Sequence, residues 1–452
     1  MLGKSVRESK RLKLSPTQII AMVFAGIILL GAVLLTMPFA SRDGNSAGFL
    51  PALFTATSAT CVTGLVMFDT WTQWSGFGQI VILCMIEIGG LGFMSAASFV
   101  IFVLRKRVGL RQRMLMAQAL SVSDMASVVR LQRVVLFGSV SVQLIGALIL
   151  TIRFLTEYDL WQSIKWGVFH AVSAFCNAGF DIFGTGTSLT TFRSDPVVLL
   201  TLAALIVIGG LGFFVWEEVV RVRRWKRLSV YTKLVLVMTG VLLLVGTIAF
   251  CLLEWNNPET MAQLPWYDRI LGGFFQSVTV RTAGFDAIGQ GGLTDTSKAL
   301  SMILMLIGGS SGSTAGGIKT VTTVVLVLFI WSRIRSKGSV CVFKHTIPGS
   351  QVLDAVMVVS IMVGLAIFGG LFICATSQNI SFVDGMYESV SALGTTGLTT
   401  GITTQIGVPA QILLIFYMYF GRVGVLTLSL GFLMGNQAQE RFQYANTNLL
   451  IG

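Results

Sequence analysis

The stretch RTAGFD at residues 281–286 decides the fold, because three other stretches of the same design occur in the chain. In each of them a glycine follows a small residue and precedes a large apolar one: Gly64, Gly179, Gly284 and Gly397. These glycines are 105 to 115 residues apart, and an aromatic residue stands ten positions before each. Serine stands six positions before three of them, and Val278 takes that place before the third. A fixed period of this size predicts four copies of one structural unit.

The four glycines stand in the same hydrophobic pattern. A spanning helix needs about 20 apolar residues, and runs of that kind occur at 17–39, 78–104, 134–155, 197–220, 233–253, 299–330, 352–374 and 409–434. Each pair of runs encloses a stretch too short to cross a bilayer, at 49–61, 162–175, 266–279 and 382–394. These stretches suit re-entrant half-helices, which a membrane accepts only where protein or water shields the backbone.

Composition and charge agree with a membrane protein. Of 452 residues, 54% are hydrophobic and 12% are charged, whereas about a quarter of a soluble domain is charged. The mean hydropathy of +0.80 excludes an ordinary cytosolic enzyme and a disordered chain. A net charge of +12 would also suit a nucleic-acid binder, but the basic residues concentrate between apolar runs, at 4–13, 105–133, 221–233 and 333–344. The positive-inside rule therefore predicts a multi-pass protein with both termini in the cytoplasm, and no nucleic acid as partner.

We expect an all-α polytopic membrane protein in which four pseudo-symmetric repeats of span, half-helix, loop and span surround a single pore. The expected divisions are a cytoplasmic N-terminus (1–16), repeat 1 (17–104), a cytoplasmic link (105–133), repeat 2 (134–227), repeat 3 (228–332), a second link (333–351), repeat 4 (352–434) and a cytoplasmic tail (435–452). The Gly- and Ser-rich residues 307–319 are expected to break the second span of repeat 3.

The repeats all run in the same direction, so their loops can face one axis. A half-helix that enters from outside points its partially negative C-terminal end at the membrane centre, which favours a cation. Glycine permits the turn and the close approach that follow, and four loops give a ring of carbonyls that can replace a hydration shell. The residues expected to line this filter are Val62, Thr63, Gly64, Asn177, Ala178, Gly179, Thr282, Ala283, Gly284, Thr395, Thr396 and Gly397. The alternative is that the glycines of an apolar chain align by composition alone.

At these residues the sequence resembles the superfamily of K+ transporters that includes the bacterial Ktr and Trk membrane subunits and the plant and fungal HKT/Trk proteins. With eight spans and no extra N-terminal pair, it is most similar to the Ktr-type potassium-translocating subunits. Such proteins use single-glycine filters in place of TVGYG, and four glycines imply a preference for K+. The resemblance implies K+ uptake across a bacterial plasma membrane with K+ in the filter. A Na+-permeable or Na+-activated form is left open.

The resemblance also implies a gate. A Gly-rich break below the filter forms an intramembrane gate loop in the family, and here it matches Gly308, Gly309, Ser310, Ser311, Gly312, Ser313, Thr314, Gly316, Gly317 and Lys319. Each glycine in a helix costs up to ~1 kcal/mol relative to alanine, so this segment cannot stay helical; a flexible kink is the alternative. The family's arginine beside the gate matches Arg422, whose place in mid-span costs at least ~2.5–3.5 kcal/mol. Its alternative role is a structural ion pair, and Lys319 could snorkel to the surface.

Partners and rival functions follow from the same features. The resemblance implies a homodimer and a cytosolic nucleotide-binding ring of the RCK type, a Ktr A-type subunit. The chain has no P-loop of its own, so nucleotide control must come from such a partner. The main rival is a secondary transporter for a Na+-coupled or organic solute, but such folds often use inverted repeats. A membrane enzyme would need clustered His, Asp or Glu at membrane depth, so we expect no enzyme.

Several charged residues near the filter admit two interpretations. Arg281 would repel cations in the pore, so we expect it behind the filter, paired with Glu388. Glu87 is either an ion site or a buried hydrogen-bonding group. Asp181 and Asp286, each two residues after a filter glycine, either concentrate cations at the outer mouth or cap the following turn.

Overall fold

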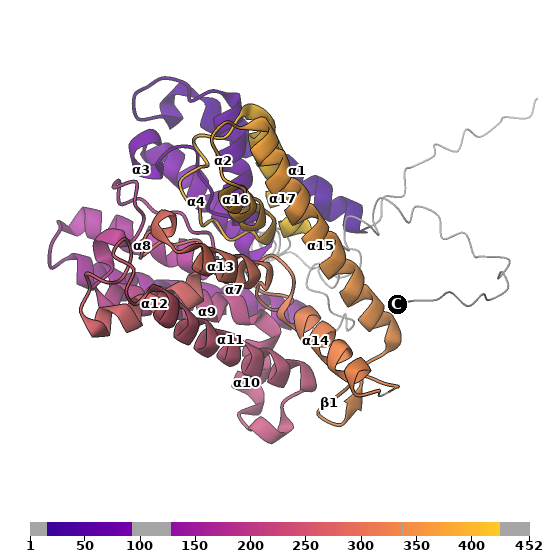
Figure 1. Ribbon diagram of the computed structural model, residues 1–452. Helices are drawn as coiled ribbons and strands as arrows, with labels where there is room; N and C mark the ends of the chain where they lie inside the picture. The colour runs from indigo at the N-terminus through magenta and orange to yellow at the C-terminus, as the bar shows by residue number, and fades with distance from the viewer. Residues whose placement is uncertain (1–15, 93–127, 337, 425–452) are drawn as a thin grey trace, which may run out of the picture.

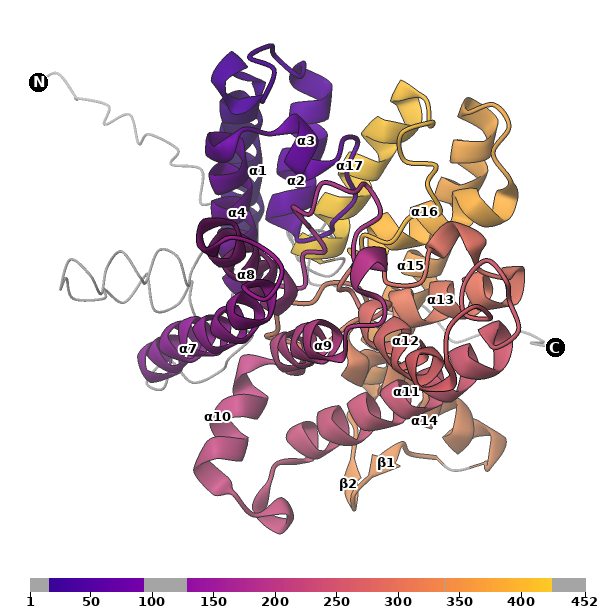
Figure 2. The ribbon, with the colours of Figure 1, turned by 90° about the vertical axis from the view of Figure 1, so that its left-hand side faces the viewer.

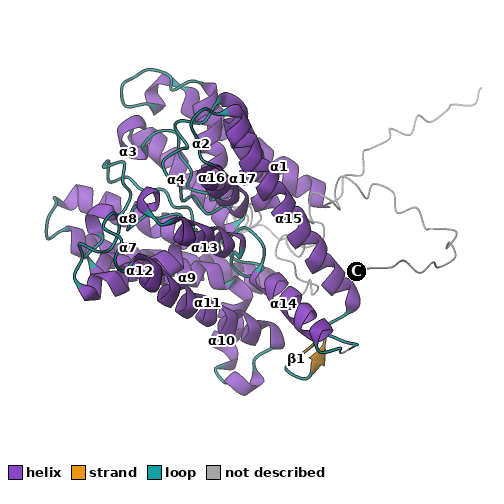
Figure 3. Ribbon diagram, in the orientation of Figure 1, coloured by secondary structure: helices purple, strands orange, loops and turns teal. Residues whose placement is uncertain are grey.

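A computed structural model describes residues 16–92, 128–336 and 338–424 (Figure 1). The expected segments 1–16, 105–133 and 435–452 lie wholly or mostly outside the described residues. The expectation of an all-α fold is confirmed, because helices make up almost all of the regular structure (Figure 3). Among the described residues, the only strands are β1 (Cys341–Val342) and β2 (His345–Thr346), which form one antiparallel hairpin.

The first helix of each repeat is long and apolar enough to cross a membrane. These helices are α1 (Pro16–Thr36), α7 (Val128–Phe154), α11 (Val230–Glu254) and α15 (Gly349–Thr376). Large apolar side chains such as Leu148, Leu244 and Leu371 are exposed on them. An outward apolar face is stable against lipid and not against water.

A half-helix follows each spanning helix, close to where the sequence predicts it. The four are α2 (Phe49–Cys61), α8 (Leu160–Phe175), α12 (Trp266–Thr279) and α16 (Phe382–Gly394). Side chains cap two of them: Asp159 accepts a bond from the Gln162 N–H at α8, and Ser381 accepts one from the Asp384 N–H at α16. Each half-helix packs against the spanning helix before it.

The second helices differ from the prediction. Runs 78–104, 197–220 and 409–434 were expected to be spans, and only 299–330 was expected to be interrupted; residues 93–104 and 425–434 lie outside the described residues. The structure has α4 (Gly76–Leu91), α9 (Pro196–Leu211), α13 (Asp295–Leu306) and α17 (Val408–Val423). Three of them end at a glycine with positive φ: Gly92 (82°), Gly212 (94°) and Gly424 (94°). Because positive φ cannot continue a right-handed helix, these three second helices stop at their glycines. The second helices α4, α9, α13 and α17 are called the inner helices below.

Within the described residues, the chain becomes helical again after the break in repeats 2 and 3. The chain bends by 93° between α9 and α10 (Phe213–Val222). Repeat 3 instead inserts residues 307–319 before α14 (Thr320–Ile334), at the position that the sequence predicts. The remaining short helices are α3 (Thr70–Gln73), η1 (Pro38–Ala40), η2 (Thr190–Phe192), η3 (Trp225–Arg227) and η4 (Gln290–Gly292).

Packing between the repeats closes a ring. The second helix of each repeat lies against the half-helix of the next: α4 on α8, α9 on α12, α13 on α16, and α17 back on α2. Figure 2 shows this arrangement, with repeat 1 in indigo, repeat 2 in purple to magenta, repeat 3 in pink to orange and repeat 4 in orange to yellow, placed in turn around a common centre. The C-terminal ends of the four half-helices, and the loops after them, therefore meet at one axis.

Candidate functional site

The four loops after the half-helices share one backbone conformation. The residue two positions before the glycine is left-handed in every repeat, with φ of 51–65°: Val62, Asn177, Thr282 and Thr395. The glycines themselves have φ of 69–99°: Gly64, Gly179, Gly284 and Gly397. Left-handed backbone is uncommon for a residue with a side chain and is a genuine outlier for a β-branched one. Its recurrence in four loops shows that the local geometry, not chance strain, is what the repeat preserves.

The glycines form a closed circuit. A Cβ placed on Gly64 would lie 2.6 Å from the carbonyl oxygen of Ala178, and one on Gly179 would lie 2.8 Å from that of Ala283. Every filter glycine thus faces the residue just before the glycine of the next repeat.

The circuit closes through the other two repeats. A Cβ on Gly284 would meet the carbonyl oxygen of Thr396, and one on Gly397 would meet that of Thr63. Only glycine fits at these four positions, because any side chain would displace a backbone carbonyl at the axis.

Hydroxyl groups hold the first and fourth loops in the same way. The N–H of Gly64 donates to Ser58 Oγ at 3.0 Å, and the N–H of Gly397 donates to Ser391 Oγ at 3.1 Å. Both serines lie near the C-terminal ends of their half-helices and are fully buried. The loops are therefore positioned by the helix ends that precede them.

The second and third loops use a different bond. Ser173 Oγ donates to the carbonyl oxygen of Phe180, and Thr279 Oγ1 donates to that of Phe285, both at 2.7 Å. Alignment on the glycines places Val278 where the other repeats have serine, but the next residue, Thr279, supplies the hydroxyl. Sequence reasoning missed Thr279 because the hydroxyl residue of repeat 3 stands five positions before the filter glycine, whereas Ser173 in repeat 2 stands six positions before it.

The expected pair between Arg281 and Glu388 is not formed. Both side chains are buried, but neither the ion pairs nor the hydrogen bonds of the described residues join them. Glu388 Oε1 accepts a hydrogen bond from the hydroxyl of Thr403, in the outer loop after the fourth filter glycine. Glu388 therefore braces its own repeat in this structure, and the bracing role across repeats assigned to these two residues is corrected.

Residues 307–319 form an ordered loop whose ends are joined. The N–H of Gly308 donates to the carbonyl of Ile318 at 2.9 Å, and the N–H of Ile318 donates to that of Leu306 at 3.1 Å. Thr320 Oγ1 donates to the carbonyl of Gly308 at 3.0 Å. Lys319 bonds back to Ala315 at 2.9 Å instead of extending away from the loop. A flexible kink would not show such internal bonding.

The loop pairs with the broken inner helix of repeat 2. The N–H of Ser310 donates to Gly210 at 3.1 Å, and the N–H of Thr314 donates to Gly209 at 3.3 Å. In return, the N–H of Phe213 donates to Gly312 at 2.9 Å. The break between α9 and α10 frees these backbone groups, and a buried backbone group needs a partner.

The same loop lies against the filter. Thr314 Oγ1 donates to the carbonyl of Phe175, the last residue of α8, at 3.1 Å. A Cβ on Gly316 would meet Thr395 Oγ1, in the fourth filter loop. Gly308 to Ser310 and Thr314 to Gly316 are buried. Thr314 and Gly316 thus bring residues 307–319 into contact with the end of α8 and with the fourth filter loop.

Arg422 reaches this loop from α17. Its guanidinium donates to the carbonyl of Thr314, to that of Gly89 at 2.5 Å and to that of Gly90 at 3.0 Å. All three partners are backbone carbonyls, so in this conformation Arg422 is not part of a structural ion pair. It joins the ends of the inner helices of repeats 1 and 4 to the loop of repeat 3.

Tyr231 is a further contact that the sequence did not point to. It lies in the first turn of α11, and its hydroxyl donates to the carbonyl of Ser311 at 2.9 Å. A tyrosine at the start of an apolar run gives no sequence signal for such a role.

A cavity of about 450 Å³ lies on the outer side of the filter. All four filter glycines line it, together with Asp69, Asp181 and Asp286. Burial, with the charge of the neighbouring Asp69, raises the pKa of Asp181 to about 7. Carboxyl groups therefore line the space beside the ring of glycines, and Asp181 is fully charged only above neutral pH.

Glu87 in α4 behaves as a hydrogen-bonding group. Gln143 Nε2 donates to its carboxylate at 3.0 Å, and the thiol of Cys176, just before the second filter loop, donates at 3.3 Å. The structure therefore favours the buried hydrogen-bonding interpretation over an ion site.

Comparison with known proteins agrees with this geometry. Residues 9–442 match the family model of the cation transport protein TrkH. The chain is 36% identical to the potassium/sodium uptake protein NtpJ of Enterococcus hirae over 99% of both chains. It is 37% identical to the Ktr system potassium uptake protein B of Bacillus subtilis over 96% of both chains. The crystal structure of the potassium transporter TrkH from Vibrio parahaemolyticus has the same fold, with a TM-score of 0.72 and 18% identity, covering 94% of this chain and 86% of that one.

Proposed function

The chain belongs to the TrkH family of cation transport proteins, and on this premise we propose that it carries K+ into the cell through the ring of four filter loops. The observation that carries the proposal is the closed circuit of glycines, each against the carbonyl before the next. Such a ring can replace the hydration shell of a cation. Two similar proteins are named for potassium uptake, one of them also for sodium.

The half-helices and the outer cavity support the same direction of transport. The partially negative C-terminal ends of four half-helices converge on the filter and stabilise a cation there. Carboxylates at the outer cavity raise the local concentration of cations before they enter. K+ then passes from the outer cavity through the carbonyls of Thr63, Ala178, Ala283 and Thr396.

Residues 308–319 serve as the gate loop in this proposal, which takes the bonded arrangement of the loop as its closed position. The loop contacts the end of α8 and the fourth filter loop, and repeat 2 and Arg422 hold it there. Passage of an ion requires these bonds to break. A guanidinium beside the axis also opposes a cation, so Arg422 acts on the gate both as a tether and as a charge barrier.

Control of the gate is assigned to a partner. We infer a homodimer whose basic cytoplasmic segments bind a nucleotide-binding ring of the RCK type. Activation by Na+ is tested by repeating the K+ flux measurement below with and without Na+. One relative is named as part of a Ktr system, which supports a separate subunit. A secondary transporter for an organic solute fits less well, because all four repeats converge on one narrow glycine ring.

Cation flux into liposomes tests the proposal. Purified protein is assayed with K+, Rb+ and Na+ as wild type, as Gly284→Ser and as Gly364→Ser. A Cβ at Gly284 would meet the carbonyl of Thr396, whereas one at Gly364 would meet nothing within 4 Å. Each form is also measured in combination with Arg422→Gln, because this substitution removes the bond from Arg422 to the gate loop and releases the loop without a partner.

The expected result is K+-selective flux that only Gly284→Ser reduces or makes non-selective. Flux of equal size and selectivity in both serine variants would contradict the filter. Flux of an organic solute coupled to Na+, without K+ flux, would favour the rival function.

A further inference from the structure

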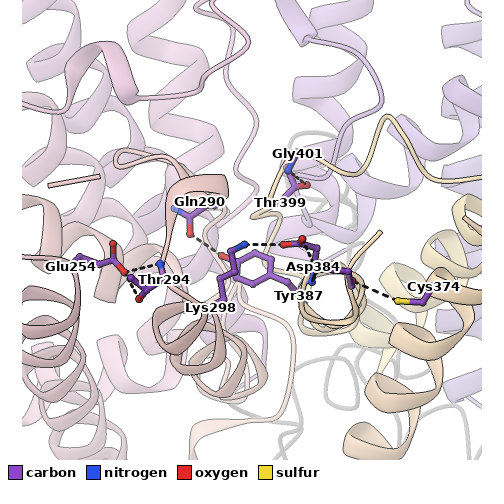
Figure 4. Close-up of polar contacts among 10 residues, drawn as sticks. Glu254, Gln290, Thr294, Lys298, Cys374, Asp384, Tyr387, Thr399 and Gly401 are labelled. Carbon is purple, nitrogen blue, oxygen red and sulfur yellow. Dashed lines mark hydrogen bonds and ion pairs between the residues drawn. The ribbon is translucent and has the colours of Figure 1, made fainter. Parts of the chain in front are cut away.

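The fourth half-helix differs from the other three at one buried position. The aromatic residue ten positions before the filter glycine is Phe54, Phe169 or Phe274 in the first three repeats and Tyr387 in the fourth. Tyr387 is fully buried, and its hydroxyl donates to Gln290 Oε1 at 2.8 Å (Figure 4). A buried hydroxyl needs a partner, and this one finds it across the boundary between repeats 3 and 4.

Gln290 connects that hydroxyl to repeat 3. Its side-chain amide exchanges two hydrogen bonds with the amide of Gln276 in α12, at 2.7 and 3.0 Å. Its Nε2 also donates to Asp286 Oδ1 at 2.8 Å. Both glutamines are 1% exposed, so water does not compete for these bonds.

Asp286 connects the network to the filter, since it stands two residues after Gly284. Its carboxylate accepts the N–H groups of Ile288 at 3.1 Å, Gly289 at 2.8 Å and Gln290 at 3.0 Å. Because these bonds occupy both oxygens, Asp286 caps the turn and is not a free charge at the mouth.

The backbone of Asp286 reaches repeat 2. Its N–H donates to Ser188 Oγ at 3.3 Å, and its carbonyl accepts the N–H of Leu189 at 2.8 Å. The residue directly behind the third filter loop is thus bonded to repeats 2 and 3, and through Gln290 to repeat 4.

We propose that Tyr387, Gln290 and Asp286 form a polar brace that positions the third filter loop and thereby sets the selectivity of the filter for K+ over Na+. The inference rests on the proposed function. The Cα of Gly284 is confined between its neighbours, because a Cβ there would lie 3.1 Å from the Cα of Gly179 and 3.3 Å from that of Gly397. A small shift of this loop therefore changes the spacing of the whole carbonyl ring, on which discrimination between K+ and Na+ depends.

A second link across the same boundary provides a control. Lys298 in α13 forms an ion pair with Asp384 in α16 at 3.0 Å (Figure 4). Lys298 also joins repeats 3 and 4, but it makes no bond to the third filter loop. Loss of this pair loosens the boundary without touching the brace.

The test measures K+ and Na+ influx into liposomes for Tyr387→Phe and Gln290→Leu, each combined with Arg422→Gln so that the gate loop is released without a partner. The matched controls are Tyr417→Phe, which removes a hydroxyl bonded to the Leu365 carbonyl at 2.6 Å, and Lys298→Gln. Thermal unfolding of each variant is followed in parallel, because a merely structural role would change unfolding and not selectivity.

We expect both brace variants to lower the ratio of K+ to Na+ influx about three- to tenfold, the effect of one net hydrogen bond on an equilibrium. The controls should keep the wild-type ratio. A wild-type ratio in either brace variant that folds, or an equal fall in the controls, would overturn the brace and leave the proposed function intact. Absence of K+-selective influx in the Arg422→Gln protein, with the brace intact, would instead overturn the proposed function and the brace together.

Discussion

At the scale of single residues, the environment separates two aspartates that the sequence presents as equivalent. The carboxylate of Asp286 accepts hydrogen bonds from three backbone N–H groups, which favours the capping interpretation. Asp181 accepts one weak backbone bond, from the N–H of Phe183 at 3.4 Å, shares a hydrogen bond with the side chain of Ser188, and lies near Asp69. Of the two, Asp181 is the carboxylate available to attract cations at the outer mouth.

Acidification outside should therefore reduce K+ influx. The pKa of Asp181 is raised from its ordinary value of 3.8 to about 7, so the group is charged above pH 7 and neutral below it. Between pH 8 and pH 6 the outer cavity loses one negative charge, and influx at low K+ should fall about two- to fivefold. Flux measured against external pH checks this. Asp181→Asn should be slow at both pH values, and Asp43→Asn, at an exposed outer site away from the cavity, should keep the pH response.

At the scale of elements, the sequence predicted the positions of the half-helices better than the ends of the second helices. The half-helices α2, α8, α12 and α16 nearly coincide with the predicted stretches, because each begins after a glycine, a proline or a capping polar residue and ends a few residues before its filter glycine. The ends of the inner helices were missed, since Gly-Gly pairs are common inside membrane helices and do not reveal positive φ.

The limits at the site have the same origin. The filter glycines could be found because steric exclusion leaves only glycine at four repeated positions. The pairing of Arg281 with Glu388 could not be tested by sequence, because charge complementarity gives no distance and Thr403 competes for the same carboxylate. The contacts of Tyr231 and Gln290 depend on packing between repeats, and no local sequence pattern predicts such packing.

The break in α9 should control the gate loop. Gly212 has φ of 94°, and a Cβ there would lie 2.5 Å from Ser310 Oγ. In Gly212→Ala, strain of ~1 kcal/mol or more and this contact should displace the loop. We expect partner-free K+ flux to rise several-fold with an unchanged ratio of K+ to Na+.

Gly44→Ala separates strain from contact. Gly44 also has positive φ, but a Cβ there would meet nothing within 4 Å. Its flux should equal that of the wild type. If Gly212→Ala shows no more flux than Gly44→Ala, the break in α9 does not hold the gate loop closed.

At the scale of the whole molecule, four repeats converge on one ion path. Each inner helix packs on the half-helix of the next repeat, and α17 completes the ring on α2. No repeat can build a filter alone, because each glycine needs the carbonyl of its neighbour. An ion in the filter thus contacts all four repeats and favours the assembled ring over any partly unfolded form.

K+ should therefore stabilise the whole chain against thermal unfolding. A ligand that binds only the folded state adds about 2.7 kcal/mol at a hundred times its Kd. We expect the melting temperature in detergent to rise with K+ concentration, and to rise less with Na+ at the same ionic strength. In Gly284→Ser the rise with K+ should disappear, because the ring cannot close around the ion, whereas Gly364→Ser should keep it. Equal stabilisation by K+ in both variants would place the stabilising ion outside the filter, and the convergence of four repeats would then have another purpose.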